Sequence, residues 1–385
     1  MAGLPTSRIS GIHQNLFPFK VDSSQFFEEW IQITPLSNFM GSELNRPIYR
    51  HKLRDGEGLQ FRVSKLLALD YKNPIVGLDQ RRGAEQEPVV NEARFDVVFK
   101  SFPLKLIGKD IVQLGTPIRL PDHVRSQLVQ VCARNLNYDL FNAMTTDLFV
   151  PSEATATPSY DRIAVAGPVN GKTSTTRGQY NALNTVTEAF NAFGTATPAA
   201  SGLSVAHIMA LKNMALRGGA DINREPRIQP AYMESFGGFP MNEYIYMIDP
   251  DSYISLLADP AYTATAIGRG VVVDRYQPQI IHGADYVGKI HGVHIYVVPD
   301  LVEYRFNSQD TQKTAAWNIF MGAGALTVGW HEMPFIVTEM DEIEREQIFV
   351  SHEQRGWGAI RFASRNQGNA LPVEQGIIHS FVRIA

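Results

Sequence analysis

Hydrophobic and polar residues alternate with a period of two in two early segments, residues 59–63 and 94–100. Such alternation is typical of strands with one buried face. Between the two segments lies a charged, glycine-bounded stretch at 77–88. We therefore predict one long two-stranded extension. Because an isolated hairpin buries little apolar surface, it should lie against another surface, such as another copy of the chain.

Apolar residues spaced three or four positions apart predict helices. The longest helix is expected at 121–148, where Pro121 and Asp122 suit the first turn. A second helix is expected at 204–217, followed by Gly218 as a C-cap signal. Between them the composition shifts to Ala, Thr, Ser, Gly and Pro, which is typical of surface loops around one short helix at 186–193.

The rest of the chain alternates short strands with short helices. Strands are predicted at 243–248, 286–290 and 293–298, with a helix at 250–258. Near the end we expect a sheet pair, 347–354 with 358–363, around Arg355, Gly356 and Trp357, and a last strand at 377–384. The first 50 residues are interrupted by prolines, which favours an arm that packs on something else over an autonomous core. The sum is an α+β chain.

Composition narrows the class of protein. Apolar residues make up 44% and charged residues 19% of 385, which is typical of an ordered chain. The longest nearly uncharged apolar stretch, 320–330, is far shorter than the ~20 residues of a membrane-spanning helix, so no membrane partner is expected. The net charge of −4 predicts only weak, non-specific contact with DNA. Cys132 is the only cysteine, which excludes an intrachain disulfide and a multi-thiolate metal site.

One glycine-rich segment raises the alternative of a nucleotide hydrolase. Gly167, Gly171, Lys172 and Thr173 resemble a phosphate-binding loop, and Asp249 at a predicted strand end resembles the aspartate that holds magnesium in such enzymes. A true phosphate loop has four residues between its glycines, whereas three separate Gly167 from Gly171. We interpret the segment as a turn in a polar loop.

Three histidines are the other candidates for chemistry. His282, His291 and His294 lie close in sequence, but the alternation places His291 and His294 on opposite strand faces, and no further ligand is paired with them. We interpret them as structural residues. No catalytic, cofactor-binding or metal site is predicted.

The order of these elements resembles the major capsid proteins of tailed bacteriophages. The resemblance implies five parts: an N-terminal arm at 1–54, an extended E-loop hairpin at 55–104, a P-domain segment with a long spine helix at 105–150, an axial A-domain at 151–335, and a C-terminal sheet of the peripheral P-domain at 336–385.

Four segments are similar to the phage capsid family typified by a virion protein of coliphage N-four. They are Pro-Ile-Val-Gly at 74–77 with Arg-Gly-Ala-Glu at 82–85, the strand and helix at 245–250 and 256–260, Gly-Lys-Ile-His-Gly-Val at 288–293, and Met-Gly-Ala-Gly-Ala-Leu at 321–326. The similarity touches most of residues 55–385 and departs at 151–204. It also implies that Asp249 is a structural residue.

The resemblance implies a non-enzymatic shell subunit located in the virion and assembled in the bacterial cytoplasm. Its partners would be other copies in pentamers and hexamers, a portal, packaged double-stranded DNA, and decoration proteins as a further candidate. A separate scaffolding protein is implied, because residues 1–54 show no coiled-coil pattern. A cellular cage of the same fold that encloses cargo stays open as an alternative, because fold alone does not separate the two.

Opposite charges are concentrated on two of these elements. The hairpin tip carries Arg81 and Arg82 together with Glu85 and Glu87. The segment before the last sheet carries Glu339, Asp341, Glu342, Glu344 and Glu346. Since the resemblance places the two elements against each other in adjacent subunits, we expect these residues to form an intersubunit contact. The alternative is two ordinary solvated clusters, because an exposed ion pair contributes only ~0 to 1 kcal/mol.

Overall fold

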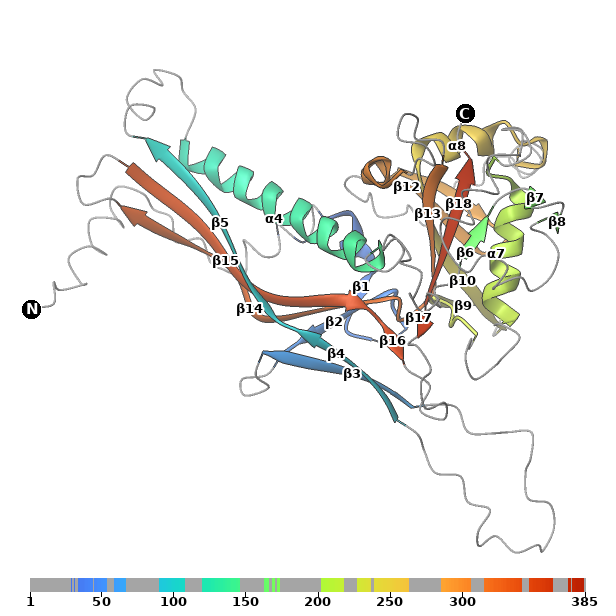
Figure 1. Cartoon of the computed structure of the whole chain (residues 1–385), viewed down its shortest axis with the longest axis horizontal. Coiled ribbons are helices and arrows are strands. Elements are labelled where there is room, and N and C mark those ends of the chain that lie inside the picture. The colour runs from blue at the N-terminus through green and yellow to red at the C-terminus, as the bar shows by residue number, and fades with distance from the viewer. Residues whose placement is uncertain are drawn as a thin grey trace, which may run out of the picture.

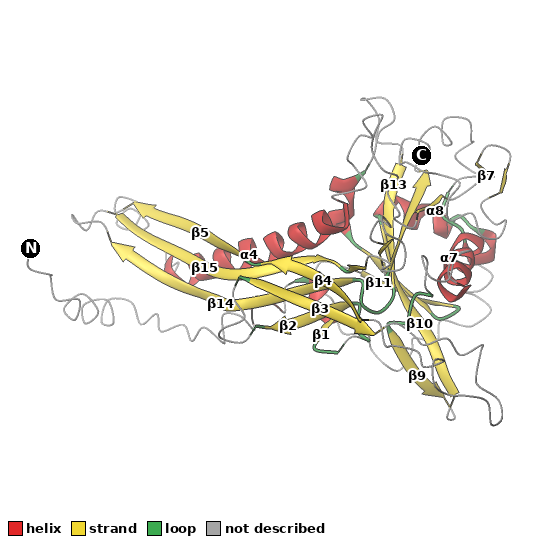
Figure 2. Cartoon of the chain, turned by 60° about the horizontal axis from the view of Figure 1, so that its bottom comes forward, coloured by secondary structure: helices red, strands yellow, loops and turns green. Residues whose placement is uncertain are grey.

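The structure is a computed structural model of the chain. It describes residues 29, 31, 34–43, 45–53, 59–66, 90–107, 120–145, 163–165, 168–169, 172–173, 202–217, 227–236, 239–262, 285–305, 315–340, 346–362, 373–374 and 376–383. These residues form the predicted α+β structure, and they are arranged in two parts (Figure 1). One part is an elongated sheet with a long helix along it, and the other is a more compact sheet with shorter helices (Figure 2).

The elongated sheet contains the longest strands. Its five strands lie in the order β1 (Met40–Gly41), β2 (Ile48–Lys52), β14 (Leu326–Met340), β15 (Glu346–Ala359) and β5 (Val98–Ile107). β15 is antiparallel to both β14 and β5, whereas β2 runs parallel to β14.

One prediction about this sheet is wrong. The expected strand pair around Arg355, Gly356 and Trp357 is a single continuous strand, in which Arg355 pairs with Trp330 and Trp357 with Val328. Glycine looked like a turn signal in the sequence. Here Gly356 and Gly358 lie inside the strand because aromatic rings pack directly on their backbone.

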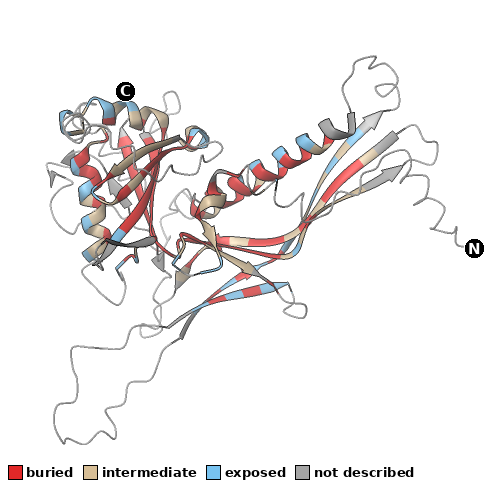
Figure 3. Ribbon diagram, turned by 180° about the vertical axis from the view of Figure 1, so that it is seen from behind, coloured by how far each residue is buried: buried red, intermediate tan, exposed pale blue. Residues whose placement is uncertain are grey.

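The long helix α4 (Leu120–Thr145) covers one face of the elongated sheet (Figure 2). Its apolar positions follow the helical period and are buried, and they include Val124, Leu128, Cys132, Leu136 and Leu140. Polar positions such as Gln127 and Gln130 are exposed, so buried and exposed positions alternate around the helix (Figure 3). The predicted helix is confirmed as far as Thr145, and residues 146–148 lie outside the described residues.

The two predicted strands of the extension form β3 (Gln60–Leu66) and β4 (Val90–Asp96). They pair antiparallel from Gln60 opposite Asp96 to Leu66 opposite Val90, so the base of the predicted hairpin is confirmed. The charged tip at 77–88 lies outside the described residues.

The compact sheet has seven strands. Six lie in the order β11 (Asp285–Ile290), β12 (Val293–Val297), β10 (Phe239–Ile248), β13 (Ala315–Met321), β18 (Ile377–Arg383) and β6 (Ile163–Val165), and β9 (Tyr232–Phe236) pairs with β10. The helices α7 (Val205–Arg217) and α8 (Pro250–Leu257) confirm the predicted ones. The helix expected at 186–193 lies outside the described residues.

Alternation along β10 divides the core into two layers. Tyr244, Tyr246 and Ile248 pack in one cluster with residues of α7 and α8. Ile245 and Met247 point to the other face and share a cluster with α4. Because the α4 cluster also takes in side chains of the elongated sheet, a continuous core joins the two parts.

The short elements connect these layers. The 3-10 helices η1 (Pro35–Phe39) and η2 (Pro299–Tyr304) each contribute buried apolar residues to the α4 cluster. Two short strands, β16 (Arg361–Phe362) and β17 (Val373–Glu374), pair antiparallel.

Two segments, the N-terminal arm and the last strand, pack on other parts of the chain than the sequence predicted. The described part of the predicted arm packs on its own chain, because Leu36, Phe39 and Ile48 are buried in the α4 cluster and β2 pairs with β14. The last strand was grouped with the C-terminal sheet, but β18 pairs with β13 and β6 in the compact sheet. Its residues from Ile377 to Val382 are all buried, which suits a strand covered on both faces. The domain boundaries themselves stay a prediction.

Candidate assembly interface

The β3–β4 pair is seated on glycines of the elongated sheet. Phe61 packs on Gly329 and Gly356, and its ring stacks on Phe95 with centroids 5.2 Å apart. Phe95 in turn packs on Gly358, where an added Cβ would lie 2.5 Å from the ring. A side chain at any of these glycines would occupy the space that the Phe61 and Phe95 rings fill. The glycines of the elongated sheet therefore fix the position of the β3–β4 pair on that sheet.

The other face of the β3–β4 pair is polar. Arg62 and Glu92 form an exposed ion pair at 3.5 Å, and Gln60 donates a hydrogen bond of 2.7 Å to Asp96. Such exposed pairs contribute ~0 to 1 kcal/mol each. This face therefore adds little to the stability of the subunit and is available for contact.

Large apolar side chains are exposed where the hairpin meets β5. Leu59 is 65% exposed and Phe99 57% exposed. Phe99 stacks on His352 at 5.3 Å, on the sheet face opposite α4. Exposed apolar surface of this kind is typical of protein interaction sites, so this junction is a candidate contact between copies.

The predicted contact residues are only partly described. Arg81, Arg82, Glu85, Glu87, Asp341, Glu342 and Glu344 lie outside the described residues. The backbone of Glu339 lies near the end of β14, opposite Ile348, and that of Glu346 begins β15, opposite Ile107. Both lie at the free end of the elongated sheet, away from the β3–β4 pair (Figure 1). The ion pairing between the two clusters therefore stays a prediction.

A buried charge network joins α4 to the elongated sheet. Arg355 of β15, which is fully buried, bonds to Asp139 and Asn135 of α4, the latter at 2.5 Å. Lys100 of β5 donates to Asp139 at 2.5 Å and to Asn135 at 3.1 Å. Glu353 contributes the second carboxylate, 2.7 Å from Arg355. Two cations thus face two carboxylates, which is how charges are tolerated in a protein interior.

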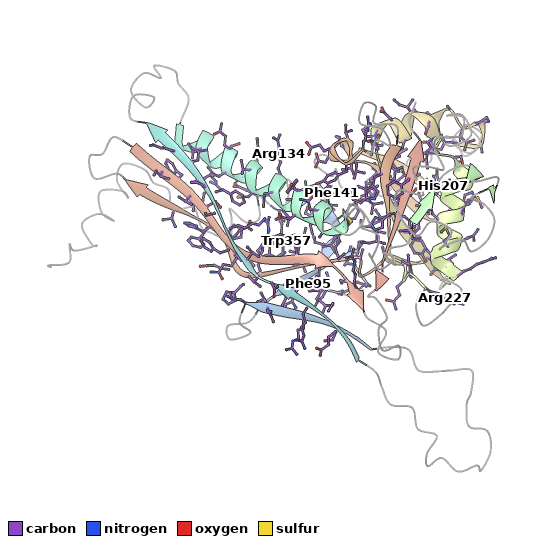
Figure 4. All side chains as sticks on the ribbon, in the orientation of Figure 1. Phe95, Arg134, Phe141, His207, Arg227 and Trp357 are labelled. Carbon is purple, nitrogen blue, oxygen red and sulfur yellow. The ribbon has the colours of Figure 1, made fainter. Side chains whose placement is uncertain are left out.

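Burial dominates the titration of this network. It raises the pKa of the Glu353 carboxyl, against the opposing effect of Arg355, and it lowers the pKa of the Lys100 ammonium. The ring of Trp357, which is labelled in Figure 4, packs against both cations. The Lys100 nitrogen lies 4.3 Å and the Arg355 guanidinium carbon 5.5 Å from the ring centroid. Sequence reasoning missed this network, because its members come from three distant segments and no spacing links them.

The glycine-rich segment does not have the architecture of a phosphate loop. Pro168–Val169 (β7) and Lys172–Thr173 (β8) pair antiparallel, so Lys172 lies in a strand and not at the start of a helix. Asp249 is fully buried and caps α8 through the N–H of Asp251. Arg305 holds it with two hydrogen bonds, of 2.6 and 2.7 Å. The structural interpretation of Asp249 is confirmed.

The histidines have structural surroundings. His294 contacts Glu243 at 3.0 Å through one ring nitrogen and Tyr286 at 3.2 Å through the other. His291 lies in the turn between β11 and β12 with φ of 49°, so its expected position on a strand face is wrong. His282 lies outside the described residues. Across the described ranges, no three His, Cys, Asp or Glu side chains are grouped so that they could hold a metal ion.

Comparisons with known proteins place the fold. No family model and no curated protein sequence matches the chain. Among solved structures, the capsid of cyanophage Pam1 is similar with a TM-score of 0.68 and 13% identity, over 92% of this chain and 93% of that one. The capsid of Ralstonia phage GP4 is similar with a TM-score of 0.62 and 18% identity, over 90% of both chains. The acidic stable capsid of Helicobacter pylori bacteriophage KHP30 is similar with a TM-score of 0.60 and 12% identity, over 91% of both chains.

The chain has the fold of phage capsid proteins. The predicted α+β fold of phage capsid proteins is thus confirmed. The assignment of α4 as the spine helix and of β3–β4 as the base of the E-loop stays a prediction. The narrower resemblance to the coliphage N-four family stays a prediction. None of the helices in the described ranges is both long and apolar enough to cross a membrane.

Proposed function

We propose that this chain is the major capsid subunit of a tailed bacteriophage, a structural protein that assembles into the icosahedral head shell around double-stranded DNA. The observation that carries the proposal is the likeness of fold to three phage capsids over at least 90% of the chain. The β3–β4 pair and the exposed apolar residues beside it also suit a subunit that completes itself with neighbours.

Copies would associate head to tail into pentamers and hexamers. A head-to-tail contact forms a closed ring when the rotation that relates neighbouring subunits adds up to a full turn. Deletion of residues 77–88 tests the role of the hairpin. We expect a subunit that stays folded by circular dichroism but forms no shells in electron micrographs. Normal shells from the deletion variant would contradict an intersubunit role for this hairpin.

We further propose that Arg81 and Arg82 pair with the acidic run at 339–346 of an adjacent copy. Each exposed ion pair contributes little free energy, but a shell repeats the same pair at every subunit, so the sum affects assembly. Arg81→Glu with Arg82→Glu should suppress assembly without unfolding the subunit. Adding Glu342→Lys and Glu344→Lys should partly restore it.

The matched control reverses the same number of charges away from the hairpin. Arg134→Glu with Arg217→Glu changes two exposed arginines on α4 and α7 and should leave assembly closer to wild type. Normal shells from the Arg81 and Arg82 reversal, or no recovery in the compensated variant, would refute the pairing.

Electron microscopy of particles also separates the proposal from its alternative. Filled, tailed particles from infected cells support the virion, and empty small cages support a cellular cage that encloses cargo. Dispersed monomers under all conditions would contradict both. In a head, the further partners would be a portal, a separate scaffolding protein, and decoration proteins as a candidate, with DNA held by weak contacts.

A further inference from the structure

Basic side chains gather at one end of the compact sheet, where the turn between β11 and β12 meets α7. Lys212 of α7 donates a hydrogen bond to the carbonyl of His291 in that turn. A Cβ added at Gly292 would lie 2.8 Å from the Lys212 nitrogen, so the lysine lies directly over the turn. Lys289, near the end of β11, comes from the other side of the same hairpin.

Two arginines extend this group along α7. The N–H of Ile228 bonds to the carbonyl of Ala215 at 3.0 Å, which places the exposed Arg227 beside the last turn of α7. That turn carries the exposed Arg217. Figure 4 shows Arg227 at this end of the compact part, far from Arg134 on α4.

Tyr244 ties the two places together. Its N–H bonds to the carbonyl of Gly292 at 3.0 Å, and its hydroxyl donates to the carbonyl of Ile228 at 3.2 Å. The lysines at the turn and the arginines beside α7 are therefore held on one rigid framework. We name Lys212, Arg217, Arg227 and Lys289 the basic end.

Among the residues that the structure describes, positive charge exceeds negative charge at the basic end. In the described part of the chain, Glu243 is the carboxylate that contacts it, and this side chain is 2% exposed and already bound by Lys289 and His294. α7 contains no acidic residue. Among the described residues, four cations of the basic end thus face one carboxylate, in a chain whose net charge is −4.

The two lysines are close enough to affect each other. Burial, and after it the charge of Lys289, lowers the pKa of the Lys212 ammonium. Holding like charges near each other costs free energy, and an anion bound beside both would offset that cost.

We propose that the basic end binds the phosphate backbone of nucleic acid without reading its sequence. The inference rests on the proposed function, because a head shell encloses DNA. Cations spread along a helix and a turn suit a repeating chain of phosphates better than one small anion. With so few charges the contact is weak, in the range of ~10⁻⁴ to 10⁻⁶ M that is typical of non-specific binding.

The test measures DNA binding by the purified, unassembled subunit. The subunit is titrated into a fluorescein-labelled DNA duplex, and binding is followed by fluorescence anisotropy at several salt concentrations between about 50 and 200 mM. For Lys212→Gln with Arg227→Gln, we expect weaker binding at low salt. The slope of log K against log salt should fall in magnitude by about 2, close to one per lost phosphate contact. The control, Lys105→Gln with Arg134→Gln, removes the same charge from exposed positions on β5 and α4 and should keep the wild-type slope.

Three results would overturn the inference: no DNA binding by wild type at low salt, equal losses in both double variants, or equal binding of polyglutamate and DNA. The last result would point to an acidic protein surface. Electron microscopy of the same variants separates this inference from the proposed function. If the Lys212 and Arg227 variant forms normal shells and binds DNA as wild type does, only the proposed DNA binding by the basic end is refuted. If the wild-type protein forms no shells under any condition, the proposed function as a shell subunit is contradicted.

Discussion

Substitution of Gly356 by alanine tests whether the glycine seat sets the position of the hairpin. A Cβ at Gly356 would lie 2.5 Å from the backbone oxygen of Asp96 and 2.7 Å from the Phe61 ring. Ordinary contact begins at 3.4 Å, so β4 must move away from β15 by the difference, 0.9 Å. Overpacking of this kind costs about 1 to 3 kcal/mol. We expect the upper part of that range, because the obstructing atom belongs to the backbone.

Gly358 provides the matched control on the same strand and face. Its added Cβ would meet only the Phe95 ring, at 2.5 and 2.6 Å, and a side chain can turn away. Gly358→Ala should therefore cost less than Gly356→Ala. Phe95→Leu should relieve Gly358→Ala, whereas Phe61→Leu should relieve Gly356→Ala only in part, because the Asp96 carbonyl remains.

The assay is urea unfolding of the unassembled subunit, with the midpoint compared at equal m-value. Electron microscopy then shows whether a displaced hairpin base also impairs shell formation, which we expect for Gly356→Ala. The reasoning is refuted if Gly356→Ala is no less stable than Gly358→Ala, or if Phe61→Leu restores it fully.

Two further predictions concern buried charge. Arg355→Leu leaves the Asp139 and Glu353 carboxylates buried without the guanidinium that faces them. The free energy of unfolding, measured in urea, should therefore fall by about 3 to 5 kcal/mol. A loss below about 1 kcal/mol would contradict this expectation. Burial lowers the pKa of His207 from 6.5 to about 4, so the folded chain binds fewer protons than the unfolded chain between those values. The unfolding free energy should then fall by up to about 3 kcal/mol as the pH drops from 6.5 to 4. His207→Gln, in which the amide can still bond to Ser380, should flatten that dependence, and an unchanged slope would contradict it.

The regular elements could be predicted because their signals are local. The buried stripe of α4 recurs at the helical period, and the alternation in β3 and β4 has the period of a strand. The helix that begins at Pro250 was predicted, whereas the N-cap role of Asp249 became clear only in the structure. Each of these depends on residues within a few positions of one another, so a single sequence contains enough information to predict it.

Only the tertiary structure decided where those elements pair. Gly356 has the local appearance of a turn residue, and its place inside β15 follows from Phe61, which arrives from nearly three hundred positions earlier. In the same way β18 joins the compact sheet, and Lys100, Asp139 and Arg355 meet beneath α4. The basic end is likewise assembled from α7, the β11–β12 hairpin and the segment at Arg227. Contacts at such separations depend on how whole elements pack, and no local pattern in the sequence encodes that packing.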